Sequence, residues 1–158
     1  MRADFDPARS DELKKPSQCP ICVSGRPRDV IAELGSTWIT AGIKASLPGY
    51  ACVVSKRHVV EPFELPPAEM TAFWEEAMVA ARALHELLRP AKLNYEIHGN
   101  SLPHLHLHLF PRFAGDPYVG GPIDPRRTVF TRTAEDLQRM SQAISTAYRG
   151  EIKNRDVE

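Results

Sequence analysis

The sequence has no excess of charge of either sign, no long apolar run and no internal repeat. Among its 158 residues, 20 Lys and Arg balance 20 Asp and Glu. A dedicated nucleic-acid-binding protein carries a basic surface, so no DNA or RNA partner is expected, although a small anionic ligand suits the composition. No stretch approaches the length of a membrane-spanning helix, and the N-terminal residues lack the apolar run of a signal peptide. These absences predict a soluble cytoplasmic protein with no membrane partner.

Cysteine is also scarce, because three residues are too few for the disulfide framework of a small secreted domain. Cys19 and Cys22 form a C-x-x-C motif, which in a reducing compartment indicates metal binding or redox chemistry. Two thiolates at this spacing can bind one tetrahedral zinc ion, but they supply only half of its ligands. Cys52 lies in an apolar segment and is expected to be a core residue.

Histidine is present in an unusual arrangement. His104, His106 and His108 occupy every second position of residues 104–109, and leucines fill the positions between them. In a β-strand, residues i, i+2 and i+4 share one face, so this pattern predicts a strand with an imidazole face and a buried leucine face. We expect the strand to end at Pro111. The alternative is a half-buried strand whose histidines are merely solvated or hydrogen-bonded.

The remaining patterns predict an α+β fold with about five antiparallel strands, one long helix and a C-terminal helix. Alternating or continuous apolar residues indicate strands within residues 29–44, 50–54 and 92–98. Apolar residues at helical spacing indicate a helix over 67–88 and a second helix that opens with a capping box at 133–136 and ends at Gly150. We expect one domain over residues 18–150, a flexible arm over 1–17 and a polar tail over 151–158.

Three histidines on one strand face are compatible with two chemistries. One imidazole can attack phosphorus and form a covalent phosphoramidate, while its neighbours orient it and donate hydrogen bonds. Alternatively, the histidines can bind a catalytic metal that activates water, which would make the protein a metallohydrolase. Alternate strand residues lie roughly 6.6 Å apart, which permits either arrangement.

The stretch from Gly99 to Arg112, with the histidines at its centre, closely resembles the signature of the histidine triad (HIT) superfamily of nucleotide hydrolases and transferases. Residues 48–58, which end in Lys56, Arg57 and His58, resemble the strand and loop that precede this signature. The resemblance implies a HIT-like fold, a nucleotide substrate and a homodimer, with no organic cofactor. It implies cleavage at the α-phosphate of a nucleoside phosphate, of the dinucleotide polyphosphate or nucleoside phosphoramidate class. A non-enzymatic, zinc-stabilised nucleotide-binding module remains a third interpretation.

The resemblance also implies roles for individual residues. His106 would be the nucleophile, which forms a nucleotidyl-histidine, and His108 and His104 would complete the catalytic triad. Phosphate or nucleotide would be bound by three residues nearby: Asn94, Asn100 and Ser101. In the zinc-containing branches, which include the galactose-1-phosphate uridylyltransferases, two cysteines join two histidines. The corresponding structural zinc ligands here are Cys19, Cys22, His58 and His104.

The sequence departs from the family pattern at two places. Residues 41–44 lack the acidic residue or asparagine that binds the ribose hydroxyls in many relatives. The Pro48-Gly49 turn is followed by Tyr50, where histidine is frequent in the family.

Overall fold

The computed structural model describes residues 11–155, and its centre is a five-stranded antiparallel sheet with the strand order β1-β2-β4-β6-β5. The strands are β1 (Val30–Glu33), β2 (Thr37–Thr40), β4 (Ala51–Ser55), β5 (Lys92–Glu96) and β6 (His106–Arg112). A short pair, β3 (Lys44–Ala45) with β7 (Phe130–Thr131), forms a separate two-stranded sheet. The predicted α+β fold with five antiparallel strands and two main helices is confirmed.

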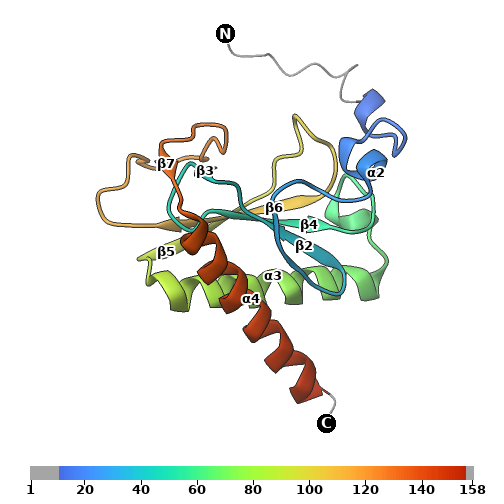
Figure 1. Cartoon of the computed structure of the whole chain (residues 1–158). Coiled ribbons are helices and arrows are strands. Elements are labelled where there is room, and N and C mark those ends of the chain that lie inside the picture. Colours follow the sequence, from blue (N-terminus) through green and yellow to red (C-terminus); the bar gives the residue numbers. More distant parts are fainter. Residues whose placement is uncertain (1–10, 156–158) are drawn as a thin grey trace.

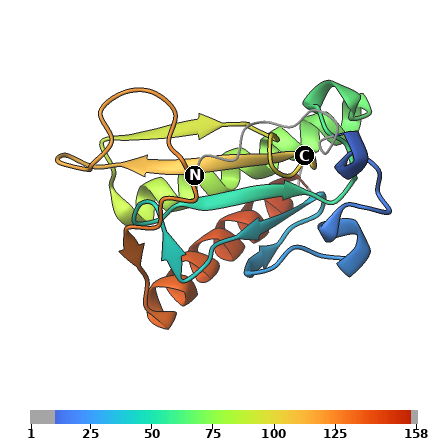
Figure 2. The ribbon, with the colours of Figure 1, turned by 90° about the horizontal axis from the view of Figure 1, so that it is seen from above.

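Two 22-residue helices, α3 (Pro67–Leu88) and α4 (Ala134–Arg155), cover the same face of the sheet (Figures 1 and 2). The opposite face lies beneath the loop that precedes β6 and the loop over residues 113–129, while the short helix α2 (Pro20–Ser24) lies near one end of the sheet (Figure 1). A 3-10 turn, η1 (Pro62–Glu64), leads into α3. No helix among residues 11–155 is long and apolar enough to cross a membrane.

The strand β6, which lies between β4 and β5, has the two faces that its alternating sequence predicts. Leu105, Leu107 and Leu109 are at most 1% exposed and pack in the main hydrophobic core with residues of α3 such as Phe73 and Leu84. Burial of each leucine side chain contributes roughly 1.5 to 3 kcal/mol. The leucines therefore fix the register of β6, because a shift by one residue would bring the imidazoles into the core.

Pro111 does not end β6 as predicted, since the strand continues to Arg112. The strand β4 pairs with β6 only as far as Leu109, whereas β5 continues to Arg112. The Ala91 N–H donates to the Arg112 carbonyl, so the hydrogen-bonding groups of Arg112 point toward β5 and those of the preceding residue point away from it. The missing N–H of Pro111 consequently lies on the side where β4 has already ended, and proline is tolerated there.

The C-terminal helix begins as predicted but ends later. The Thr133 hydroxyl accepts from the Asp136 N–H at 3.0 Å, and the Asp136 carboxylate accepts from the Thr133 N–H at 2.9 Å. Gly150 does not stop the helix, which continues to Arg155, and Glu151 of this last turn pairs with Arg82 of α3 at 2.7 Å. A glycine within a helix costs only about 1 kcal/mol relative to alanine, so one ion pair and packing against α3 suffice to continue it.

Residues 1–10 and 156–158 lie outside the described residues, so most of the predicted arm and the end of the predicted tail are not part of this description. Residues 11–13 form a helical turn. The domain boundaries at residues 18 and 150 stay a prediction.

Candidate functional site

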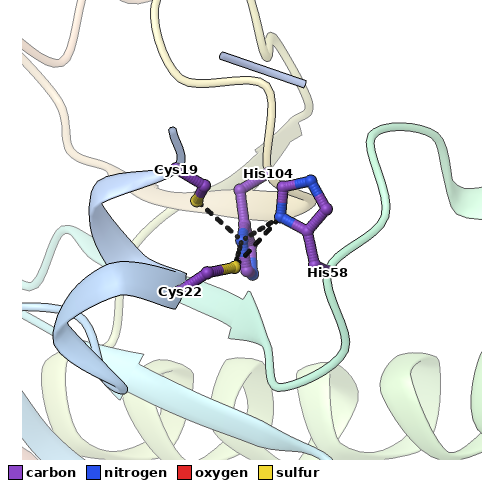
Figure 3. A group of neighbouring side chains, drawn as sticks. All are labelled: Cys19, Cys22, His58 and His104. Carbon is purple, nitrogen blue, oxygen red and sulfur yellow. Dashed lines mark hydrogen bonds between the residues drawn. The ribbon is translucent and has the colours of Figure 1, made fainter. Parts of the chain in front are cut away.

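Four side chains from three separate segments meet beside the start of β6 (Figure 3). Cys19 is the N-cap of α2 and Cys22 lies within this helix, while His58 follows β4 and His104 lies two residues before the start of β6. Their potential ligand atoms all lie within 4.8 Å of one another. The structure therefore brings together the four residues that the sequence assigns to one metal site.

The distances within this Cys-His cluster match the edges of a tetrahedron around a zinc ion. The two Nδ1 atoms of His58 and His104 are 3.2 Å apart, and the S–N distances are 3.2 Å (Cys22 to His58), 3.4 Å (Cys19 to His104) and 3.7 Å (Cys22 to His104). Tetrahedral zinc with ordinary bond lengths places two nitrogen ligands about 3.3 Å apart and sulfur and nitrogen about 3.6 Å apart. The donor set thus fits a closed Cys2His2 zinc site.

Both imidazoles of the cluster have their outer nitrogen fixed by a backbone carbonyl. The Nε2–H of His104 donates to Ser55 O at 2.8 Å, and the Nε2–H of His58 donates to Lys14 O at 2.7 Å. In each ring the lone pair is consequently on Nδ1, the atom that faces the sulfurs. Such outer hydrogen bonds are typical of metal-binding histidines, because they fix the tautomer and the ring orientation.

The surroundings of the cluster favour a bound cation. Cys19 is fully buried with Ile21 and Val54 in a small hydrophobic cluster. Burial, followed by the hydrogen bond and charge of Cys19, raises the pKa of the Cys22 thiol to about 11. Two thiolates in this position therefore need a positive charge nearby, and metal binding would release their protons.

His106 lies at the first position of β6 and belongs to a different environment from His104. Its Nδ1–H donates to the backbone carbonyl of His104 at 2.6 Å, so its Nε2 carries the lone pair. Within residues 11–155, no hydrogen bond engages this Nε2. Burial lowers the pKa of His106, although the bond to His104 opposes this effect, and the ring is thereby favoured in its neutral, nucleophilic form.

His108 lies behind His106 on the same face of β6, with ring centroids 4.8 Å apart. The Tyr50 hydroxyl at 2.9 Å and the Cys52 thiol at 3.4 Å both point to its Nδ1. Since two donors converge on Nδ1, we assign this atom as the acceptor and place the proton on Nε2. Burial, followed by the charges of His106 and His98, lowers the pKa of His108 to about 3, so this ring is neutral near pH 7.

A cleft opens beside His106 between the start of β6, the loop after β5 and the residues that follow β4. The residues that line it come from four segments of the chain: Lys14, Val60, Glu61, Ile97, His98, Gly99, Asn100, Pro103, His104, Leu105 and His106. Of the three predicted phosphate-binding residues, Asn100 lines this cleft. Asn94 lies in β5 opposite Phe110, and Ser101 is exposed in the loop before β6. The roles of all three stay predictions.

Several residues that contact the histidines were not among those predicted from the sequence. Tyr50 and Cys52 reach His108 because Cys52 is its partner in the β4–β6 register. Tyr50 and Cys52 are two positions apart, so a strand places both side chains on the same face. The apolar sequence of residues 51–54 instead suggested a strand buried on both faces. His98 forms an edge contact with His108 at 5.2 Å between centroids, and its place on the same face as Glu96 follows from the alternation in β5.

Comparisons with known proteins identify relatives with this fold. A family model described as HIT domain matches residues 24–115, more than half of the chain. A histidine triad protein from Bradyrhizobium japonicum is 25% identical with a TM-score of 0.64, and the match covers 75% of this chain and 89% of that one. A histidine triad protein from Sinorhizobium meliloti is 25% identical with a TM-score of 0.66, and the match covers 76% of this chain and 90% of that one. A Zn-bound histidine triad family protein from Mycobacterium smegmatis is 22% identical with a TM-score of 0.58 and coverage of 89% and 99%, which shows the fold alone. No curated protein matches significantly.

Proposed function

The chain belongs to the histidine triad family, and on this basis we propose that it is a nucleotidyl hydrolase or transferase with His106 as its covalent nucleophile. The substrate would be a nucleoside phosphate of the dinucleotide polyphosphate or nucleoside phosphoramidate class. The observation that carries the proposal is the hydrogen bond from Nδ1 of His106 to the His104 carbonyl, which leaves Nε2 as the nucleophilic atom beside the cleft.

The first chemical step follows from the two rings on β6. Nε2 of His106 attacks the α-phosphorus, a P–N bond forms, and the bond from phosphorus to the leaving group breaks. The positive charge that the ring acquires is stabilised by the His104 carbonyl, which accepts its Nδ1–H. His108, protonated on Nε2, would donate to a phosphoryl oxygen, where negative charge develops. Water or another acceptor then resolves the nucleotidyl-histidine.

We propose that the Cys-His cluster binds structural zinc. Cys19, Cys22, His58 and His104 would hold the ion, which would then link α2, the loop after β4 and the segment before β6. His104 connects this site to the chemistry, since its side chain faces the cysteines and its carbonyl holds His106. A rigid His104 would therefore keep the nucleophile oriented. The description of the Mycobacterium smegmatis protein as Zn-bound is consistent with such a site in a related fold.

Trapping of the intermediate tests the proposal. The protein is mixed with dinucleoside polyphosphates and with nucleoside phosphoramidates, quenched within one turnover and analysed by intact mass. We expect a nucleotidyl adduct on His106 with at least one substrate, and a loss of turnover of about 1,000-fold or more in His106→Gly. His85→Gln, an exposed histidine of α3, serves as the control and should retain activity. Wild-type turnover in His106→Gly would refute the proposal.

One observation favours the metallohydrolase alternative. Cys52, His106 and His108 also place potential ligand atoms within 4.8 Å of one another. Against it, His104 faces a different group of ligands, so the triad does not offer three nitrogens to one ion. Chelation that abolishes activity while circular dichroism shows an unchanged fold would favour the metallohydrolase. Nucleotide binding without turnover of any substrate would favour a non-enzymatic module.

A further inference from the structure

A fourth histidine lies at the cleft in contact with a carboxylate. His98 follows the end of β5 and lines the cleft together with His106. Its Nε2 lies 2.8 Å from the carboxylate of Glu96, and the two side chains are only 30% and 14% exposed. Its ring also meets the ring of His108 edge-on at 5.2 Å. The phosphoryl transfer described above uses neither His98 nor Glu96.

The carboxylate of Glu96 is fixed from a second direction. Its two oxygens accept from the Ile123 N–H at 3.2 and 3.1 Å, so the loop over residues 113–129 holds the carboxylate in place. The Glu96 carboxylate in turn accepts a hydrogen bond from Nε2–H of His98. Nδ1 is thus the nitrogen of His98 that no hydrogen bond engages within residues 11–155. A carboxylate bound in this way fixes the orientation of the imidazole ring.

We propose that His98, oriented by Glu96, donates the proton that the leaving group needs, and that the site therefore favours substrates with an amine leaving group. The inference rests on the proposed function, because it needs His106 as the nucleophile. An amine cannot depart from phosphorus as an anion, whereas a polyphosphate departs without a proton. A dedicated proton donor consequently points to nucleoside phosphoramidates rather than dinucleoside polyphosphates as the substrate class.

The proton and electron balance of the cycle is simple. As Nε2 of His106 forms its bond to phosphorus, the P–N bond to the amine breaks and the amine keeps the electron pair. The amine takes the proton from Nδ1 of His98, which becomes neutral. Water then attacks the nucleotidyl-histidine, gives one proton to His98 and leaves its oxygen on phosphorus, while His106 is released. No oxidant or further reactant is required.

Several charged and titratable groups surround His98. Glu96 is on its own strand, and His106 and His108 face it from β6. Asp124 of the covering loop interacts electrostatically with His98. Lys14 and Glu61 line the same cleft from two further segments. The two substrates are therefore compared at one pH, so that these groups carry the same charges in both measurements.

The experiment measures kcat/KM of wild type and His98→Gln on two substrates with the same nucleotidyl group. One carries an alkylamine leaving group, which needs a proton, and the other carries p-nitrophenolate, which does not. We expect His98→Gln to lose about 100-fold or more on the alkylamine and less than about threefold on the p-nitrophenyl ester. Glu96→Gln should show a smaller loss of the same selectivity, and His85→Gln should change neither rate.

Two outcomes would overturn the inference. An equal loss on both substrates would make His98 a structural residue, and an unchanged alkylamine rate would make it dispensable. The intact-mass assay with the p-nitrophenyl ester separates these results from failure of the proposed function. If the adduct on His106 forms and the leaving-group effect is missing, His98 is not the proton donor. If His106 carries no adduct and its substitution leaves turnover intact, the proposed function itself fails.

Discussion

At the scale of single residues, three identical side chains at identical spacing have different properties because each has a different neighbour. The Ser55 carbonyl fixes His104 with its lone pair on Nδ1, toward the cysteines. The carbonyl of His104 fixes His106 with its lone pair on Nε2. The Tyr50 hydroxyl leaves the proton of His108 on Nε2. The hydrogen-bond partners, rather than the spacing of the histidines, therefore decide which nitrogen of each ring is available.

Removal of the Tyr50 hydroxyl should weaken catalysis. In Tyr50→Phe, only the Cys52 thiol, a weak donor, remains to fix the tautomer of His108. We expect kcat/KM to fall about 10-fold, equivalent to the loss of about 1.4 kcal/mol from one hydrogen bond in the transition state. Tyr50→His restores a ring that can donate and should recover part of the rate. Equal rates in wild type and Tyr50→Phe would contradict this role.

His108 should also make the stability of the protein depend on pH. The unfolded chain binds a proton at His108 near the ordinary pKa of 6.5, whereas the folded protein binds it only near 3. Between these values the unfolded state holds more protons, so the free energy of unfolding decreases as the pH falls, by up to about 1.4 kcal/mol per pH unit. Urea denaturation from about pH 6 to about pH 4 should give a shallower slope for His108→Gln, by about 1 kcal/mol per unit. A slope identical to that of wild type would show that His108 titrates normally.

At the scale of secondary-structure elements, one buried carboxylate connects the helices to the sheet. Glu76 of α3 is 7% exposed and accepts from the Ser36 N–H and the Thr37 hydroxyl, which belong to the β1–β2 turn and to β2. The Tyr148 hydroxyl of α4 lies 3.4 Å from the same carboxylate and accepts from the Gly35 N–H at 2.8 Å. Glu76 thereby accepts from the buried Thr37 hydroxyl and from the partly buried Ser36 N–H, and so links α3 to the β1–β2 turn and to β2.

Replacement of this carboxylate should be costly. Glu76→Ala leaves the Ser36 N–H and the fully buried Thr37 hydroxyl without their acceptor. We expect a loss of about 2 to 4 kcal/mol in the free energy of unfolding, because each unpaired buried donor costs about 1 to 3 kcal/mol. Glu86→Ala, at an exposed position of the same helix, should change stability by less than about 0.5 kcal/mol. Chemical denaturation of both variants measures the difference, and similar values would contradict the role of Glu76.

The sequence predicted the elements whose pattern is local and missed the features that depend on neighbours. Helix α3 spans the predicted residues 67–88, and β6 buries the predicted leucines. The ends of β6 and α4 depend on contacts with other elements, which the sequence pattern alone does not reveal. The strand β6 continues because β5 pairs with it at Pro111, and α4 continues to a turn in which Glu151 pairs with Arg82 of α3. The contacts of Tyr50 and His98 likewise arise from strand register, which a single sequence does not reveal.

At the scale of the whole molecule, the Cys-His cluster connects segments that the sheet alone leaves apart. It joins α2 and the loop after β4 to the segment that leads into β6 (Figure 3). The Lys14 carbonyl, bound by His58, adds the segment before α2 to this assembly. The homodimer that the family resemblance implies stays a prediction. The edge strand β5, where Tyr95 and Ile97 are partly exposed, is one place where a second copy could extend the sheet.

Removal of the metal should destabilise the purified protein. We expect one zinc per chain, and a strong chelator should lower the free energy of unfolding by about 3 kcal/mol or more, since the binding of a structural metal is coupled to folding. Cys19→Ser should start with low zinc content and respond little to the chelator. Cys52→Ala provides the matched control, because this buried cysteine lies outside the cluster and should keep both the zinc and the chelator response. The zinc site would be contradicted if the purified protein contained no zinc and its free energy of unfolding did not change with the chelator.

The separation of the cluster's residues along the chain has a consequence for the order of folding. Cys22 and His58 are 36 positions apart, His58 and His104 are 46, and Cys19 and His104 are 85. Closure of such loops costs entropy, so we expect the full ligand set to assemble only after β4 and β6 have paired. The two cysteines can capture an ion early, but both histidines must wait for the sheet. Completion of the metal centre would then coincide with fixation of the His104 carbonyl, and the nucleophile would acquire its orientation at the last stage of folding.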